Sequence, residues 1–354
     1  MKRLAILLLA GSCSDDVAPL EATSSSGSTA ATGTSGKPQS TSTADTSVGS
    51  TGAVTTGVAT SESQPDSSSG PSGDVPPSGL CDGFRNSAGQ TITVFSQAEV
   101  DAVAGVGCII GALVVYGDNG DDVVSDLSPF ASLEAVSEHI AFNGLMLGEL
   151  EGFESLQWIG GDLVLGSLSP GIPGCHENPN LANLDALANL QHFENLFLCG
   201  DLQDALVSID GLDAALDGRI AGHVELTDLA ALSDLAAFDG VTSINGGLSL
   251  LDLPAVTALD GFSSLTGAAA ITISRTGVAD LYGLESLVAI DDRLGITSNE
   301  QLETLDGLDA IVSVGSLYVM NNPALAQAEA EAFASSIDIA NETLICGNLD
   351  GPPC

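Results

Sequence analysis

Residues 294–302 read LGITSNEQL, and 23 positions later residues 317–325 read LYVMNNPAL. Each stretch opens with two apolar residues around a variable one, and Asn and then Leu follow at spacings of three. Two further triplets, Leu248-Ser-Leu250 and Ile271-Thr-Ile273, come earlier at the same interval. A fixed period in the low twenties is typical of solenoids, in which each unit buries its apolar side only by stacking on its neighbours.

The same triplets extend toward the N-terminus at less regular spacing. Apolar residues on either side of a variable residue predict short strands with one buried face. A last strand is predicted at Leu344–Cys346, and the 33-residue interval after residue 163 predicts an inserted loop around residues 168–177. The five earlier triplets are Leu113–Val115, Ile140–Phe142, Leu163–Leu165, Leu196–Leu198 and Val224–Leu226.

A second marker, apolar-acid-Gly-apolar, follows most triplets. Apolar residues then continue at every third position, as in Leu305, Leu308 and Ile311, and this spacing predicts a nearly 3-10 path with one edge turned inward. The acid and the glycine predict a turn. Stacking at about 4.8 Å could align the carboxylates into a like-charged ladder that binds cations, and the alternative is six independent turn residues. The carboxylates concerned are Glu151, Asp185, Asp210, Asp239, Asp260 and Asp306.

Two stretches carry a family resemblance. The repeats Leu294-x-Ile296-x-x-Asn299 and Leu317-x-Val319-x-x-Asn322 match the leucine-rich-repeat consensus. Cys81, followed by residues 108–115 (CIIGALVV), resembles the opening of a receptor L domain, the leucine-rich module of insulin- and growth-factor-receptor ectodomains.

The resemblance covers roughly residues 81–354 and implies a mainly β, right-handed solenoid with short helical or 3-10 segments. It also implies a Cys81–Cys108 disulfide and a role in recognition. The chain departs from the pattern at Leu253 and Thr276, which fill the Asn position in their repeats. An Ala- and Glu-rich stretch, residues 325–336, predicts a helix that covers the open end of the stack.

Six cysteines accompany the repeats, and they allow 15 pairings. Cys175 lies in the predicted insertion and Cys199 ends the next triplet, so these two could meet. Cys346 and Cys354 flank a Gly/Pro tail. The alternative for Cys175 is a metal site with His176, although no partner motif accompanies it. The six are Cys81, Cys108, Cys175, Cys199, Cys346 and Cys354.

The N-terminus predicts export. A basic start, the apolar run Leu4–Ala10, small residues and Cys13 follow the layout of a signal peptide, and they resemble the lipobox of bacterial lipoproteins. That resemblance implies lipidation of Cys13 and, with Ser14 next, the outer membrane; the alternative is secretion with Cys13 removed. Residues 14–78, rich in Ser, Thr, Gly and Pro, predict a disordered linker with a reach of about 45 Å before a domain at 79–354.

Charge and motifs exclude several functions. The 354-residue chain has a net charge of -40, and residues 79–354 hold 40 acidic and four basic side chains, a net charge of -36. This charge repels nucleic acid and anionic lipid. No nucleophile elbow, zinc-binding helix motif or phosphate loop is present, and the four histidines share no motif, so no enzyme is predicted. No cofactor is predicted either; Ca²⁺ at Asp118–Asp122 is the alternative to a plain turn.

The outward face of the strands is the candidate binding surface. Residues between and after the triplet apolar positions should point outward, and in that set only Glu225 is charged. Exposed apolar and aromatic residues are enriched at binding sites, although several of these could instead pack under loops. The predicted residues are Tyr116, Phe197, Leu251, Thr272, Thr297, Tyr318 and Met320, with Val114 and Ser249 beside them.

The sequence therefore predicts a membrane-anchored surface protein that recognises or adheres to an extracellular protein or glycan without catalysis. The alternative is a structural envelope component whose acidic surface binds cations or wall polymers.

Overall fold

A computed structural model describes residues 80, 85–86, 91–117, 123–166, 178–200 and 205–354. The predicted signal, its Cys13, the linker, the Asp118–Asp122 turn, Cys81 and the Cys175-His176 pair lie outside these residues. Their roles stay predictions.

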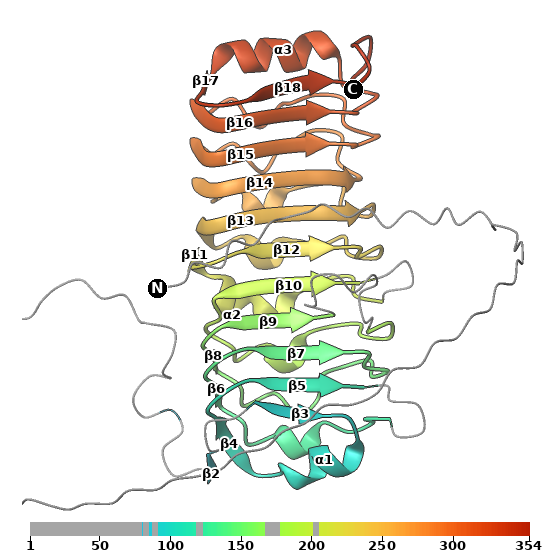
Figure 1. Ribbon diagram of the computed structural model, residues 1–354, viewed down its shortest axis with the longest axis vertical. Helices are drawn as coiled ribbons and strands as arrows, with labels where there is room; N and C mark the ends of the chain where they lie inside the picture. The colour runs from blue at the N-terminus through green and yellow to red at the C-terminus, as the bar shows by residue number, and fades with distance from the viewer. Residues whose placement is uncertain (1–79, 81–84, 87–90, 118–122, 167–177, 201–204) are drawn as a thin grey trace, which may run out of the picture. The chain divides into compact units, whose positions relative to one another are not determined.

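The described part of the chain is mainly β, with one large and one small parallel sheet (Figure 1). The strands of the large sheet are β3 (Ile92–Val94), β5 (Leu113–Tyr116), β7 (Ile140–Asn143), β9 (Asp162–Leu165), β10 (Asn195–Cys199), β11 (Gly218–Ile220), β12 (Val224–Thr227), β13 (Val241–Leu253), β14 (Gly267–Thr276), β15 (Ala289–Thr297), β16 (Ser313–Met320), β17 (Asp338–Ile339) and β18 (Thr343–Cys346). The small sheet holds β2 (Arg85–Asn86), β4 (Val106–Ile109), β6 (Ala135–Val136) and β8 (Trp158–Ile159). We call one strand of the large sheet and the segment that leads to the next a coil.

Strand pairing in the large sheet follows the predicted intervals. Leu248 pairs with Ile271, Ile271 with Leu294 and Leu294 with Leu317. The first residues of the earlier triplets pair in the same way, from Leu113 onward. The predicted strands and their stacking order are thus confirmed, and β3, which the sequence analysis missed, adds one more at the N-terminal end.

The last strand has the opposite phase to the prediction. Leu317 pairs with Thr343 and Val319 with Ile345, so Ile345 packs against the core. Leu344 instead pairs with Tyr318 and is 41% exposed. The predicted inward orientation of Leu344 was wrong because Thr343, a polar residue, takes the register position opposite Leu317. Cys346, which pairs with Met320, is buried.

The return segments are tight turns and 3-10 helices: η1 (Ser128–Phe130), η2 (Asp185–Leu187), η3 (Asp210–Leu212), η4 (Ala236–Phe238) and η5 (Asp260–Phe262). In a coil without an assigned helix, the amide of Leu308 donates to the carbonyl of Leu305 (3.2 Å) and that of Ile311 to the carbonyl of Leu308 (3.1 Å). These i to i+3 bonds confirm the 3-10 path that the spacing of three predicted.

The carboxylate ladder is not continuous. Helix η4 follows Leu235 as η5 follows Leu259, so Ala236 takes the position that Asp260 has in the next coil. Asp239 lies at the end of η4, and its predicted place in the ladder was wrong. The apolar-Asp-Gly-apolar pattern at residues 238–241 misled because it is displaced by three residues from the true turn.

The glycine of the marker serves coil-to-coil contact. A methyl group on Gly261 would overlap the main-chain carbonyl of Leu235 in the preceding coil, and one on Gly307 would overlap that of Leu281. Gly307 also has a φ of 106°, whereas Gly261 does not have positive φ. The close approach of the preceding backbone therefore explains the glycine at this position more generally than turn geometry does.

Asparagines form a buried column beside the apolar core. Asn322 Oδ1 accepts from the amide of Asn299 (2.9 Å), and Asn348 Oδ1 accepts from the amide of Asn322 (3.2 Å). Asn322 Nδ2 donates to the carbonyl of Ile296 (3.0 Å). Leu253 and Thr276 are buried in the preceding coils, where the sequence placed them in the same column. Each asparagine thus satisfies backbone groups that two coils leave buried.

Helices lie at both ends of the large sheet, α1 (Gln97–Ala102) beside β3 and α3 (Gln327–Ser336) beside β17 and β18 (Figure 1). The predicted helix at 325–336 is confirmed and begins two residues later. Ala330 of α3 is fully buried. The third helix, α2 (Asp213–Leu216), is a single turn after η3. Within the described ranges, no helix has the length and apolarity needed to cross a membrane.

Candidate recognition surface

Two columns of outward side chains, at the middle and toward the ends of the strands, together form what we call the strand face. A third column precedes them and includes Asp162, Asn195, Ala270, Arg293 and Ser316. Because side chains alternate along a strand and the strands are parallel and in register, equivalent residues of successive coils stack. The middle column is Thr93, Val114, Ala141, Val164, Phe197, Glu225, Ser249, Thr272, Gly295, Tyr318 and Leu344. The outer column includes Tyr116, Asn143, Cys199, Thr227, Leu251, Ser274, Thr297, Met320 and Cys346.

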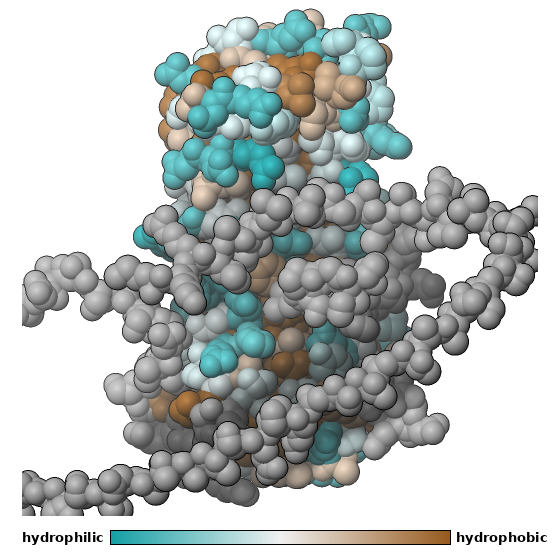
Figure 2. Space-filling view, in the orientation of Figure 1, coloured by the Kyte–Doolittle hydropathy of each residue, from teal (hydrophilic) through white to brown (hydrophobic). Residues whose placement is uncertain are grey.

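All seven residues predicted for the binding face lie in these columns, and each is partly exposed. Their role in binding stays a prediction. Figure 2 shows hydrophobic side chains near the C-terminal end of the sheet, bordered by hydrophilic ones, on the side where Figure 1 shows the strands.

Accessibility of the strand face is uneven. Ala141 is 6% exposed and Val164 is 1% exposed, although both belong to the middle column. The accessible residues therefore fall into two groups, one at β3 and β5 and one from β10 to β18, although Ser274 and Cys346 are buried within the second. The sequence analysis did not include Ala141 and Val164 in the face, and their register with Val114 was the signal that would have placed them there.

At the N-terminal group, Phe95 stacks on Tyr116 with ring centroids 4.8 Å apart and planes 7° from parallel. Phe95 follows β3 and is exposed. The pair extends the outer column by one aromatic ring that the sequence analysis missed.

Near the C-terminal end, polar contacts fix the side chains. Tyr318 Oη donates a hydrogen bond to Glu342 Oε2 (2.7 Å), and this carboxylate raises the pKa of Tyr318. Thr297 Oγ1 lies 3.0 Å from Ser274 Oγ in the preceding coil. These contacts leave Tyr318 with a defined ring position beside Met320 of the same strand.

Glu225 is the one carboxylate of the two columns. It is paired with Phe197 of β10 on one side and Ser249 of β13 on the other. It accepts a long hydrogen bond from Thr227 Oγ1 (3.4 Å). Burial raises the pKa of Glu225, which the Thr227 hydroxyl and His223 offset only in part.

A charged corner borders the outer column where the strands end. Asp228, Asp252 and Arg275 occupy equivalent positions of three coils and all have φ between 53° and 57°. The Arg275 guanidinium forms an ion pair with Asp252. Burial, followed by the charge of Asp252, raises the pKa of Asp228, and Arg275 opposes this shift. The sequence analysis missed this corner, although the spacings of 24 and 23 residues would have identified it.

The described histidines have structural contacts. His223 Nδ1 accepts from the amide of Gly247 (2.8 Å). His192 stacks on Trp158 at 3.8 Å, and burial lowers its pKa. Among the residues that the structure describes, no three His, Cys, Asp or Glu side chains lie together as a metal site requires.

One disulfide is described in full, between Cys346 and Cys354 with Cα atoms 5.0 Å apart. It ties the C-terminal tail to β18. Cys108 and Cys199 are also disulfide-bonded. Because Cys81 and Cys175 lie outside the described residues, the pairings proposed for them stay predictions.

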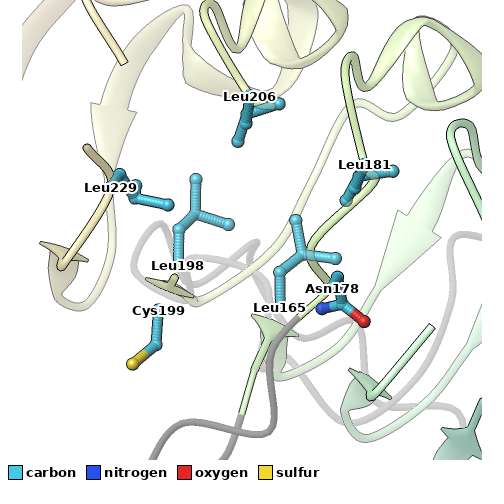
Figure 3. Close-up of a pocket in the computed structure, with 7 residues that line it drawn as sticks. All are labelled: Leu165, Asn178, Leu181, Leu198, Cys199, Leu206 and Leu229. Atoms are coloured by element: carbon cyan, nitrogen blue, oxygen red, sulfur yellow. The ribbon is translucent and has the colours of Figure 1, made fainter. Parts of the chain in front are cut away.

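Two hollows are lined by other parts of the described chain, and Cys199 is the one strand-face residue that lines either of them. A small apolar one of about 20 Å³ lies between coils, with its lining shown in Figure 3: Leu165, Asn178, Leu181, Leu198, Cys199, Leu206 and Leu229. Its size suits one water molecule rather than a ligand. A polar groove of about 390 Å³ is lined by Glu134, Glu154, Ser155, Gln157, Asn189 and Gln191.

Comparison with known proteins gives little further information. No protein-family model and no curated protein matches the chain. Among solved structures, the crystal structure of an internalin (InlF) from Listeria monocytogenes matches with 14% sequence identity, 72% of this chain and 84% of that chain covered, and a TM-score of 0.27. A TM-score this low does not establish a shared fold, so the architecture rests on the strand pairings given above.

Proposed function

We propose that this protein is a non-catalytic recognition or adhesion protein of the cell surface. In this proposal, Cys13 carries a lipid that anchors the chain in the outer membrane, residues 14–78 act as a disordered linker, and residues 79–354 form a right-handed leucine-rich solenoid of the receptor L-domain type. Its partner is an extracellular protein or glycan, which docks on the strand face. Secretion without the lipid is the alternative location.

The observation that carries the proposal is the contrast between the strand face and the rest of the protein. Residues 79–354 have a net charge of -36, yet the two columns contain a single carboxylate. Phe197, Leu251, Tyr318 and Met320 are partly exposed there. Clustered aromatic and apolar side chains with few charges are characteristic of the centre of an interface.

The rigidity of the sheet supports the same function. In the large sheet, each strand from β5 to β16 except β11 is hydrogen-bonded to a strand on both sides, and the inward side chains beneath these strands are buried in one continuous core. Association is favoured when the binding side chains are already ordered, because less conformational entropy is lost on binding.

The test is to screen the full chain against arrays of glycans and extracellular proteins and then to repeat any saturable interaction with a triple variant, Tyr116→Ala, Phe197→Ala and Tyr318→Ala. The control replaces Val288 and Val312 by alanine, because they are 47% and 61% exposed and lie outside the two columns. We expect binding to be lost in the triple variant and kept in the control. Binding retained by a folded triple variant would move the site to another surface.

The structural alternative is an envelope component whose carboxylates bind cations. Glu151, Asp185 and Asp210 still occupy successive coils, which is the observation that favours it. This function predicts that Ca²⁺ or added salt raises the melting temperature. An unchanged melting temperature in both titrations would exclude it.

A further inference from the structure

The middle of the strand face combines a carboxylate with apolar neighbours. Glu225 lies between Phe197 and Ser249 in the middle column, and Thr227, the next residue of the outer column, pairs with Leu251. Phe197 and Leu251 are both partly exposed. A partner that covers this region must therefore remove Glu225 from water together with the ring and the leucine.

The protein compensates the charge of Glu225 only in part, through Thr227 and through His223, whose Nδ1 already accepts from the Gly247 amide. The hydrogen bond from Thr227 to Glu225 is 3.4 Å long, at the limit of a useful interaction. The nearest arginine along the charged corner, Arg275, is engaged by Asp252. Burying a carboxylate without a partner is costly, so a neutral ligand placed over Glu225 would meet an energetic penalty.

The charge of the region favours a cation on the partner. Glu225, Asp228 and Asp252 together with Arg275 leave two negative charges on three neighbouring coils of a strongly acidic protein. A metal ion does not fit, because it needs several oxygen ligands around one point and the described carboxylates form no such group. A guanidinium does fit, because it can pair with a carboxylate through two N–H groups and stack on an aromatic ring such as Phe197.

We infer that the partner is a protein that presents an arginine or lysine, flanked by apolar side chains, to Glu225, with Phe197 and Leu251 on either side of it. This inference rests on the proposed function, since it names the partner of the same strand face. The cation supplies the positively charged partner that Glu225 lacks, and the flanking side chains bury Phe197 and Leu251.

The experiment selects 12-residue peptides from a random display library against the full chain and measures their affinities for three variants. Glu225→Gln removes the charge and keeps the shape, Glu303→Gln is the matched control at an exposed glutamate outside the strand face, and the triple alanine variant reports binding to the face. Each arginine-containing peptide is also measured with citrulline, its neutral isostere. Melting temperatures show that each variant is folded.

We expect selected peptides to be enriched in arginine or lysine beside apolar residues. Their affinity should fall about tenfold or more with Glu225→Gln or with citrulline, as the loss of a charged hydrogen-bonded pair implies, and should stay within about twofold with Glu303→Gln. Peptides that need the face but show no cation enrichment, or no response to Glu225→Gln, overturn the inference and leave the proposed function standing. If no peptide is selected, the inference is contradicted, and the proposed function stands only with a glycan as the partner. If the selected peptides bind the triple variant unchanged, both are contradicted.

Discussion

Replacing Asn322 by alanine tests whether the buried asparagine column holds the C-terminal coils together. Asn322 is 0% exposed. Its Nδ2 donates to the Ile296 carbonyl (3.0 Å) and to Asn348 Oδ1 (3.1 Å), and its Oδ1 accepts from the Asn299 amide (2.9 Å). Asn322 Oδ1 also accepts from Asn299 Nδ2 (3.3 Å), so alanine removes four bonds but leaves the other buried groups in place.

The magnitude follows from the groups left without a partner. Asn348 Oδ1 keeps the amide of Asn322, so two main-chain groups, the Ile296 carbonyl and the Asn299 amide, lose the bond described here. Each unsatisfied buried group costs about 1–3 kcal/mol, which gives a loss of about 2–6 kcal/mol in the free energy of unfolding. A water molecule that entered the vacated space would bring the loss toward the lower value. Against a typical total of about 5–15 kcal/mol, either value is large.

The assay is urea denaturation followed by circular dichroism, with Asn189→Ala as the control. Asn189 also bonds a neighbouring coil, since its Nδ2 donates to the Glu154 carbonyl (2.7 Å), but it is exposed, so its loss should cost about 0.5–1.5 kcal/mol. Because stacked repeats can unfold in parts, hydrogen exchange at the Asn299 amide should be measured as well, and Asn322→Ala should accelerate it. Equal stability of the two variants would refute the reasoning.

Further predictions concern the glycine position and two titrating groups. Gly261→Ala should destabilise the fold by about 1–3 kcal/mol because its methyl group overlaps a carbonyl of the preceding coil, whereas Gly295→Ala, whose nearest neighbour would be 3.7 Å away, should be neutral or slightly stabilising; equal melting temperatures would contradict this. Burial raises the pKa of Glu225, so the ionised form of this side chain destabilises the fold. Glu225→Gln should therefore raise the melting temperature at pH 7, and this gain should disappear as the pH falls below the ordinary glutamate pKa of about 4.3. A gain that persists at pH 3 would be inconsistent with this cause. Burial lowers the pKa of His192, so the emission of Trp158, the single tryptophan, should change with a midpoint below the ordinary histidine value of about 6.5, and His192→Gln should abolish the change.

The sequence was most informative where the period was constant. From residue 248 onward each triplet paired with the next as the spacing of 23 predicted. The strands at the two ends of the sheet were harder to predict because each lacks one of the usual markers. Strand β3 lies 21 residues before the next triplet, and β18 has Thr343 at an inward position. Asn348, three residues after Ile345 as Asn322 is after Val319, was the signal that would have corrected the phase of β18.

The sequence predicted which side chains point outward on the strand face, but it did not predict which of them are accessible to solvent. Alternation along a strand decides which side chains leave the core, and it placed Phe197 and Tyr318 on the same face. It carries no information on what lies above that face, so the burial of Ala141 and Val164 could not be foreseen. The pKa shift of Glu225 was equally out of reach, because burial depends on neighbouring coils and not on local sequence.

Residues that repeat once per coil stack into a column, and this arrangement suits some side chains and not others. An amide can donate to one neighbour and accept from the other, so Asn299, Asn322 and Asn348 can repeat without conflict. Carboxylates cannot, because two unit charges about 4.8 Å apart repel by roughly 0.9 kcal/mol even at the dielectric constant of water.

The acidic turn column is continuous from Glu151 through Asp185 to Asp210 and is interrupted after them. Ala236 separates Asp210 from Asp260, and Tyr282 separates Asp260 from Asp306. Where a break doubles the separation to about 10 Å, the two charges lie farther apart than the screening length of physiological salt, about 8 Å, so their repulsion is largely screened. Tyr282 reports the field that is left, since the charge of Asp306 is the largest cause of its raised pKa. The breaks in this column therefore reduce the repulsion between its remaining carboxylates.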